Sequence, residues 1–278
     1  MFGNSFDIAN NVSSMAVLSY LTAFDTQLSN ATNELSSGLR VSTPGQDPAA
    51  YSIGINAQSQ VSALGSIQQN IQDASSMVQL AEGGTSQVLT ILQQELSLAQ
   101  EASNGTISST EATALNTEVT DLNTSINDIA ASTQYNGISM LSTATTAETF
   151  QVGTQSTSTA AVTFNGVSAT DLTVSGVSLA TTSGAQAAVV SINAAITAVE
   201  GYQGTYGALA AALGYDLSAV QGRITDLNAA YASAMDANTA QATQQYAQAQ
   251  VAVQSTSQML SQAELRPQVL LGILNKLP

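Results

Sequence analysis

The side chains that most often carry catalysis are scarce in this sequence of 278 residues. It contains no histidine, no cysteine and a single lysine. Catalytic triads, thiolate nucleophiles and metal sites built on histidine or cysteine are therefore excluded. A pair of carboxylates could still transfer protons, and Glu118 and Asp121, three residues apart on a predicted helix, are the nearest such pair. We interpret them as part of a solvated helix face, and we predict neither enzymatic activity nor a cofactor.

Composition also narrows the class of partners. Only four basic residues (Arg40, Arg223, Arg266 and Lys276) stand against 19 carboxylates, and the net charge is −15. A nucleic-acid-binding protein neutralises phosphates with a patch of basic side chains, which this chain cannot supply. The sequence has no run of 18 apolar residues, and its start lacks the basic and apolar regions of a signal peptide. We expect no nucleic-acid binding, no membrane insertion and, for an exported protein, a route without a cleaved leader.

The helices expected to carry the polar residues named above are predicted by the apolar residues of the chain. These recur at alternating spacings of three and four. This pattern is typical of a coiled-coil seam. It recurs at Leu21, Phe24, Leu28, Ala31, Leu35 and Leu39, within residues 64–92, 115–129 and 213–231, and again at Val253 and Leu260. No proline falls between residues 49 and 266, so long helices are permitted there. We predict a mainly α fold, a long antiparallel helical bundle or coiled coil.

Capping signals place the first long helix. Asp47-Pro48 is typical of an N-cap followed by proline at the first helical position. It predicts a helix that runs to about Asn104, where Asn-Gly supplies a left-handed stop. Gly83-Gly84 lies inside this helix, where each glycine costs about 1 kcal/mol relative to alanine. We interpret this pair as a bend or a close packing contact.

Further signals place the following helices. Ser108 and Glu111 form a capping box that starts the second of them, and Asn136-Gly137 is expected to end it. Helices resume near Ala185 and continue to about residue 263. The Ala- and Gln-rich stretch 240–250 is compatible with disorder, but both residue types favour helix and the apolar seam resumes after it, so we favour helix.

Residues 143–184 have a different composition, rich in Thr, Ser and Gly, with runs of period two. Short strands are predicted at 149–152, 162–164 and 172–174, and Asn165-Gly166 is predicted to form a turn. We interpret this segment as a small β-hairpin insert between two helical halves.

Eight segments, in order along the chain, resemble those of bacterial flagellins. They are LSSGLRV (35–41), DPAA (47–50) followed by Ile53, AEG (81–83), ASNGT (102–106), QYNGISML (134–141), FQVG (150–153), LSQA (260–263) and PQVL (267–270). The resemblance covers both ends of the chain. It implies a non-enzymatic, structural subunit of an extracellular filament.

The resemblance also implies a division of the chain. Residues 1–45 and 235–278 would be terminal helices in the inner core of the filament. Residues 46–142 and 185–234 would form an outer-core helical bundle, and 143–184 its β-hairpin insert. Because the insert is short, we expect the variable outer domains of many flagellins to be missing. The terminal segments either fray in isolation or pair with each other and with neighbouring copies.

Partners and assembly residues follow from the same resemblance. It implies a polymer of many identical copies, a flagellar export chaperone, cap and hook-junction proteins, and export by the flagellar type III route. The expected subunit-interface residues are Leu21, Phe24, Leu28, Leu35, Leu39, Arg40, Val253, Leu260, Val269 and Leu270. Two alternatives stay open: a hook–filament junction protein, and a secreted binding module.

Three positions match the epitope by which the innate immune system of vertebrates recognises flagellins. They are Gln94, Leu98 and Glu118. Flagellins that are recognised carry an arginine at the first of these positions, where this chain has Gln94. We therefore expect recognition to be weak.

Overall fold

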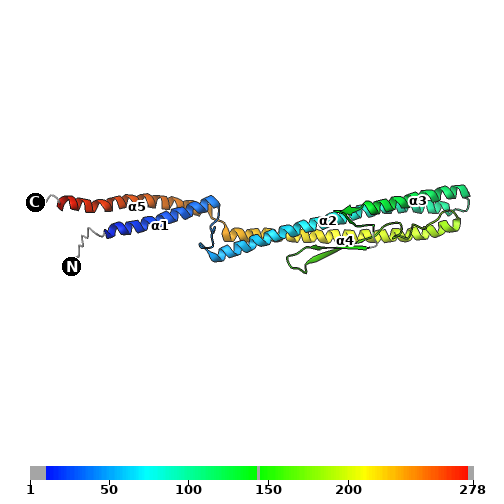
Figure 1. The fold of residues 1–278 in the computed structure, drawn as a ribbon, viewed down its shortest axis with the longest axis horizontal. Helices are drawn as coiled ribbons and strands as arrows, with labels where there is room; N and C mark the ends of the chain where they lie inside the picture. Colours follow the sequence, from blue (N-terminus) through cyan, green and yellow to red (C-terminus); the bar gives the residue numbers. More distant parts are fainter. Residues whose placement is uncertain (1–10, 143–144, 275–278) are drawn as a thin grey trace. The chain divides into compact units, whose positions relative to one another are not determined.

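The computed structural model of this chain describes residues 11–142 and 145–274, and within them it is mainly helical (Figure 1). Five helices follow one another as α1 (Val12–Ser37), α2 (Pro48–Ala102), α3 (Ser109–Ser132), α4 (Thr182–Met235) and α5 (Thr239–Leu274). Two antiparallel strand pairs lie between α3 and α4. The predicted fold class, a long helical coiled coil with a small β insert, is confirmed.

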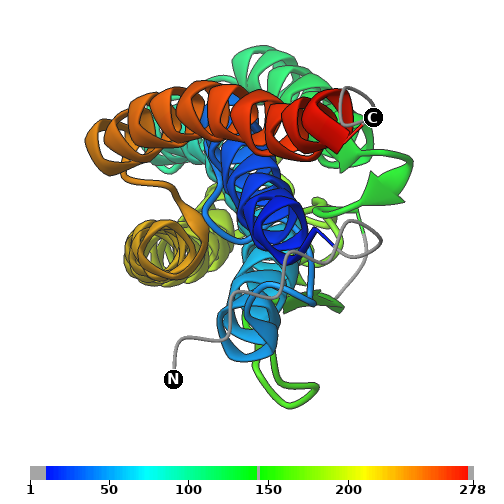
Figure 2. The same cartoon turned by 90° about the vertical axis from the view of Figure 1, so that its left-hand side faces the viewer.

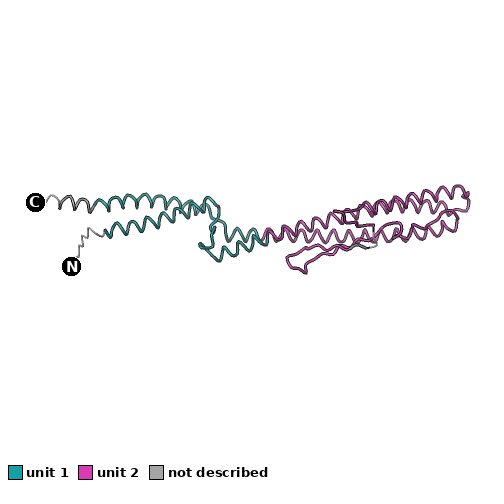
Figure 3. The backbone as a smooth tube through the Cα atoms, viewed as in Figure 1, with its two compact units in different colours: residues 1–60, 227–278 teal, residues 61–226 magenta. Residues whose placement is uncertain are grey.

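The chain forms two compact units, coloured separately in Figure 3. Unit 1 comprises residues 1–60 and 227–278, and therefore holds α1, α5, the beginning of α2 and the end of α4. Unit 2 comprises residues 61–226, with the rest of α2 and α4, all of α3 and the strands. The assignment of chain segments to inner and outer parts of a filament stays a prediction.

In unit 1, α1 and α5 lie side by side, as both Figure 1 and Figure 2 show. The Asn11 side chain caps α1 by accepting a hydrogen bond from the Ser14 backbone. The same side chain donates to the backbone oxygen of Ala263, so the start of α1 lies against the C-terminal half of α5. Gly38 ends α1 in the left-handed conformation (φ 72°), which glycine adopts without strain. The Ala- and Gln-rich stretch 240–250 is helical, as predicted.

In unit 2, burial along α2 follows the coiled-coil spacing without a break. Buried positions separated alternately by three and four residues are Leu64, Ile67, Ile71, Ala74, Val78, Ala81, Thr85, Val88, Leu92, Glu95, Ala99 and Ala102, and Met77 and Gly84 beside them are buried as well. The Ser108–Glu111 capping box starts α3 as predicted. Gly84 is the close packing contact that the sequence allowed, because an added Cβ would lie 2.7 Å from Leu141 Cδ1 and 2.8 Å from Thr133 Oγ1.

One predicted helix stop is wrong. Asn136-Gly137 does not end α3, which ends at Ser132. The pair instead forms the turn between β1 (Gln134–Tyr135) and β2 (Ile138–Ser139). Both residues have positive φ, 50° and 79°, which a two-residue hairpin turn of type I′ requires.

The second hairpin pairs β3 (Thr145–Gln151) with β4 (Thr159–Asn165). Two details of the prediction are wrong: Asn165-Gly166 does not form a turn, because Asn165 is the last residue of β4, and 172–174 is not a strand. Leu172 and Val174 are buried, but Thr173 between them has a φ of 57°, which breaks an extended chain. The Asn123 side chain on α3 donates to the Val174 carbonyl, so this segment is held by helix contacts instead of a strand partner.

Candidate functional site

The terminal helix pair of unit 1 is the candidate functional site. Its seam alternates at three and four residues on both helices: Ser14, Val17, Leu21, Phe24, Leu28 and Ala31 on α1, and Ala242, Tyr246, Ala249, Val253, Thr256, Leu260 and Ala263 on α5. Small residues at Ala31, Ala242 and Ala249 are buried and let the two backbones approach closely. The predicted residues Leu21, Phe24, Leu28, Val253 and Leu260 all lie on this seam.

Two helices alone do not enclose this seam. Leu21, Phe24, Leu28, Val253 and Leu260 are only half-buried in the single chain. An apolar groove of about 380 Å³ remains between α1 and α5, lined in part by the side chains of Val17, Tyr20, Phe24 and Met259.

Large apolar side chains of the pair are also exposed, some of them beside the groove. The exposed apolar set comprises Val12, Met15, Leu18 and Tyr20 on α1, and Val251, Met259 and Leu265 on α5, each more than half exposed. At 100° per residue, the set on α1 and the α1 seam together surround the helix. Only Asp25 and Glu34 bring charge to α1. The exposed apolar side chains lie in residues 12–20, so this first part of α1 has more apolar surface than α5 covers.

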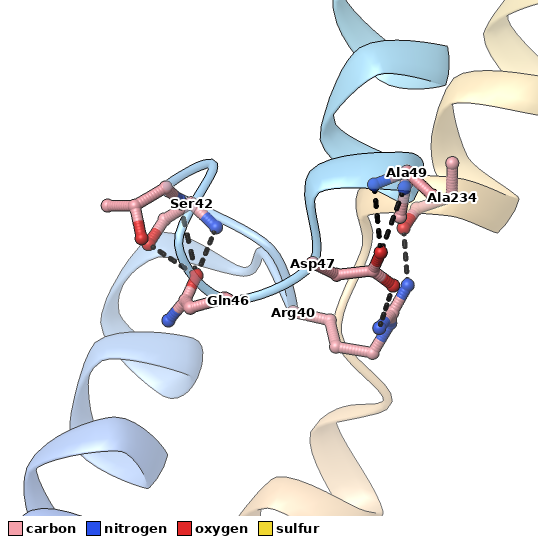
Figure 4. Close-up of polar contacts among 8 residues, drawn as sticks. Arg40, Ser42, Gln46, Asp47, Ala49 and Ala234 are labelled. Atoms are coloured by element: carbon pink, nitrogen blue, oxygen red, sulfur yellow. Dashed lines mark hydrogen bonds and ion pairs between the residues drawn. The ribbon is translucent and has the colours of Figure 1, made fainter.

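Arg40 joins the loop after α1 to the end of α4, as Figure 4 shows. Its backbone N–H donates to the Met235 carbonyl (2.7 Å), and its guanidinium donates to the Ala234 carbonyl (2.6 Å). A second guanidinium nitrogen lies 3.6 Å from Asp47 Oδ2. The neighbouring residue Leu39 forms an antiparallel bridge with Asp236. These contacts hold the loop after α1 (residues 38–47) against the segment that leads from α4 into α5 (residues 234–238). We call these two segments together the joint.

Asp47 links the joint to α2. Its Oδ1 accepts hydrogen bonds from the backbone N–H groups of Ala49 and Ala50, which makes it the predicted N-cap. The Ala50 bond first, and then the Ala49 bond and the charge of Arg40, hold the pKa of Asp47 below its usual value. The loop before it is closed by the Gln46 side chain, which accepts from Ser42.

A small apolar cluster lies beneath the joint. Val41, Ala50 and Met235 are buried in it, and Leu39 packs against them. Gly54 is needed beside it, because an added Cβ would lie 2.4 Å from Met235 Cγ. Sequence reasoning missed the pairing of Gly54 with Met235. The available signal was a glycine on the apolar spacing between Ala50 and Ala57.

The remaining predicted residues have different surroundings. Leu35 keeps the spacing of the α1 seam and is 36% exposed in the single chain. Leu39 and Arg40 belong to the joint. Val269 and Leu270 lie within α5, but their side chains fall outside the described part of the structure. The roles of all these residues in assembly stay predictions.

The three epitope-matching positions lie on neighbouring faces of α2 and α3 in unit 2. Gln94 Nε2 donates to Glu118 Oε1 across 3.4 Å, and both side chains are exposed. Leu98 is half-buried. Asp121 is exposed as well, which is the arrangement of a solvated helix face. The described residues contain no group of three or more Asp, Glu, His or Cys side chains that could hold a metal ion.

By length and composition, α4 is apolar enough to cross a membrane, although only 28% of its most apolar window is buried. Its many alanines, together with Val, Ile and Leu residues such as Ile192, Val199 and Leu213, give this hydropathy. The expected absence of a membrane span stays a prediction.

Both halves of the chain match known family models. Residues 8–146 match the bacterial flagellin N-terminal helical region, and residues 189–274 match the bacterial flagellin C-terminal helical region. The chain belongs to the bacterial flagellin family. The resemblance read from the sequence motifs is thus confirmed.

Relatives within the flagellin family are about a third identical over roughly half of this chain. Polar flagellin F of Vibrio parahaemolyticus is 31% identical over 149 residues, 54% of this chain and 40% of that protein. Flagellin A of Vibrio cholerae is 32% identical over 152 residues, 55% of this chain and 40% of that protein. The chain therefore spans about two fifths of the length of these relatives.

A solved structure has the same fold. It is a protein from Vibrio parahaemolyticus described as flagellar hook-associated, with a TM-score of 0.58 and 14% identity. The match covers 69% of this chain and 100% of that structure. At this identity the likeness concerns the fold alone.

Proposed function

We propose that this chain is a structural subunit that self-assembles into the bacterial flagellar filament for swimming motility. The observation that carries the proposal is the exposed apolar set on α1 and α5. Fully burying one large apolar side chain stabilises an assembly by roughly 1.5–3 kcal/mol. Seven such side chains on two helices therefore favour an environment in which other copies cover them.

The half-buried seam supports the same proposal. Leu21, Phe24 and Leu28 on α1 and Val253 and Leu260 on α5 retain apolar surface that a second pair of helices can cover. In a polymer, every copy buries this surface at once, so assembly stabilises the ordered state of the terminal helices by mass action. We propose that these five residues lie at subunit interfaces, as do Leu35, Leu39, Arg40, Val269 and Leu270.

Further parts of this proposal follow from family membership. The subunit would be extracellular, exported by the flagellar type III route without a cleaved signal peptide. An export chaperone, a cap and hook-junction proteins would be its partners, besides many copies of itself. It would bind no nucleic acid, insert into no membrane, and have no enzymatic activity or cofactor.

The alternative is a hook–filament junction protein, a fold relative that is present in few copies. The likeness to a hook-associated structure concerns the fold and fits both readings. The two readings differ in whether the chain polymerises without limit.

The test is seeded growth of the purified chain. Fragments of sheared filament are added to the monomer, and the products are imaged by negative-stain electron microscopy. We expect long filaments of uniform diameter, and none when residues 1–40 are deleted. A stable, folded chain that never extends the seeds would overturn the filament reading in favour of the junction protein.

A further inference from the structure

Glu95 occupies a core position of the α2 seam in unit 2. It lies at the seam spacing between Leu92 and Ala99, and all three side chains are 0% exposed. Thr85 is the other polar residue on the buried α2 seam, but its hydroxyl donates to the carbonyls of Ala81 and Glu82 and is thereby satisfied. The Glu95 carboxyl group has no such hydrogen bond.

Neither carboxyl oxygen of Glu95 has a hydrogen-bond partner among the residues that the structure describes. A counter-ion is not at hand either, because Arg223 is the single basic residue of unit 2 and its side chain is exposed. Acidic side chains on α2 and on the helices beside it are exposed to water: Glu101 on α2, Glu111, Glu118 and Asp121 on α3, and Glu200 on α4.

An ionised carboxylate in such a place is strongly disfavoured, because water solvates the charge far better than apolar side chains do. Burial raises the pKa of Glu95 from 4.5 to about 7, and no charge or hydrogen bond contributes to this shift. The folded protein therefore holds this proton roughly 300-fold more tightly than the unfolded chain does.

We propose that Glu95 makes the helical unit of residues 61–226 proton-sensitive: the unit packs with a neutral carboxyl in its core and loosens when that carboxyl loses its proton. This inference rests on the packing of the single chain and does not depend on filament assembly.

The direction with pH follows from the raised pKa. Below about pH 4.5 the carboxyl is protonated in both folded and unfolded chains, and Glu95 introduces no pH dependence. Between about pH 4.5 and 7 the unfolded chain releases the proton first, so stability falls as the pH rises. Above about pH 7 the loss is complete, and the folding constant is lower by roughly 300-fold.

The experiment compares the full chain with Glu95→Gln, which keeps the shape and removes the ionisable group. Glu118→Gln is the matched control, since it removes the same charge from an exposed position of the same unit. Urea unfolding of the monomer is followed by circular dichroism at pH 4.5, 6 and 8. Between pH 4.5 and 8 we expect the folding constant of the original chain to fall up to roughly 300-fold more than that of Glu95→Gln. Glu118→Gln should follow the original chain.

Equal pH dependence in the original chain and Glu95→Gln would overturn the proposal. A direct measurement covers the case in which the Gln variant does not fold. Carbon-13 NMR of glutamate carboxyl groups in the original chain should show one resonance that titrates near pH 7. If every glutamate of the folded chain titrates below about pH 5.5, Glu95 is ionised in the core and the inference is wrong.

Discussion

Met259 offers a sharp test of what the terminal helices do. It lies on α5 beside the groove between α1 and α5, and 62% of it is exposed in the single chain. Met259→Ser removes an apolar side chain that contributes little to the folded monomer. If other copies cover this position, the substitution should weaken assembly and leave the monomer almost unchanged.

The magnitude follows from the exposed fraction. Full burial of a methionine side chain is worth about 1.5–3 kcal/mol, and roughly three fifths of that remains to be gained here. Assembly should therefore lose about 1–2 kcal/mol per subunit, which raises the critical concentration roughly 5–30-fold.

Met77→Ser is the matched control, because it makes the same substitution in another helix at a position that is 2% exposed. There the monomer itself should lose roughly 2–5 kcal/mol, as expected for truncation of a buried side chain. The critical concentration is read as the free subunit left after filaments are pelleted. Monomer stability is read from urea unfolding below that concentration.

Two results would refute the reasoning. One is a critical concentration for Met259→Ser equal to that of the original chain, which would mean that no copy covers this position. The other is a loss of monomer stability as large as that of Met77→Ser, which would mean that Met259 is already buried in solution.

Three further predictions concern the joint and the exposed face of unit 2. Gly54→Leu should lower the unfolding midpoint by the equivalent of roughly 1–3 kcal/mol through its clash with Met235, and adding Met235→Ala should recover part of the loss; no recovery would locate the strain elsewhere. Asp47→Ala should melt at a lower temperature than Asp47→Asn at pH 7, since asparagine still caps α2. The original chain should lose stability as the pH falls through the lowered pKa of Asp47, below 3.8, and a flat melting profile there would contradict the cap and ion pair. Reporter cells that carry the vertebrate flagellin receptor should respond weakly to this chain and more strongly to Gln94→Arg; a strong response to the original chain would contradict the epitope match.

Local sequence signals predicted the long helices well. The Asp47-Pro48 start of α2, its end near residue 104 and the Ser108 capping box are each set by residues within a few positions. The apolar spacing also predicted which side of α2 is buried, because a seam that repeats over many turns can pack in only one way.

Long-range contacts decided the details that the sequence predicted wrongly. Asn136-Gly137 is compatible with both a helix stop and a hairpin turn. The pairing of β2 with β1 selects the turn. Leu172 and Val174 alternate as a strand does, yet the hydrogen bond from Asn123 holds them without a strand partner.

The sequence by itself determined that this chain builds long helices, lacks the common catalytic side chains and carries the flagellin motifs at both ends. Tertiary structure alone decided that Gly54 accommodates Met235, that Arg40 holds two distant chain segments, and that Glu95 is buried without a partner. The reason is physical: helix formation depends on neighbours along the chain. The free energy of a buried charge or a close contact depends on side chains brought near by folding.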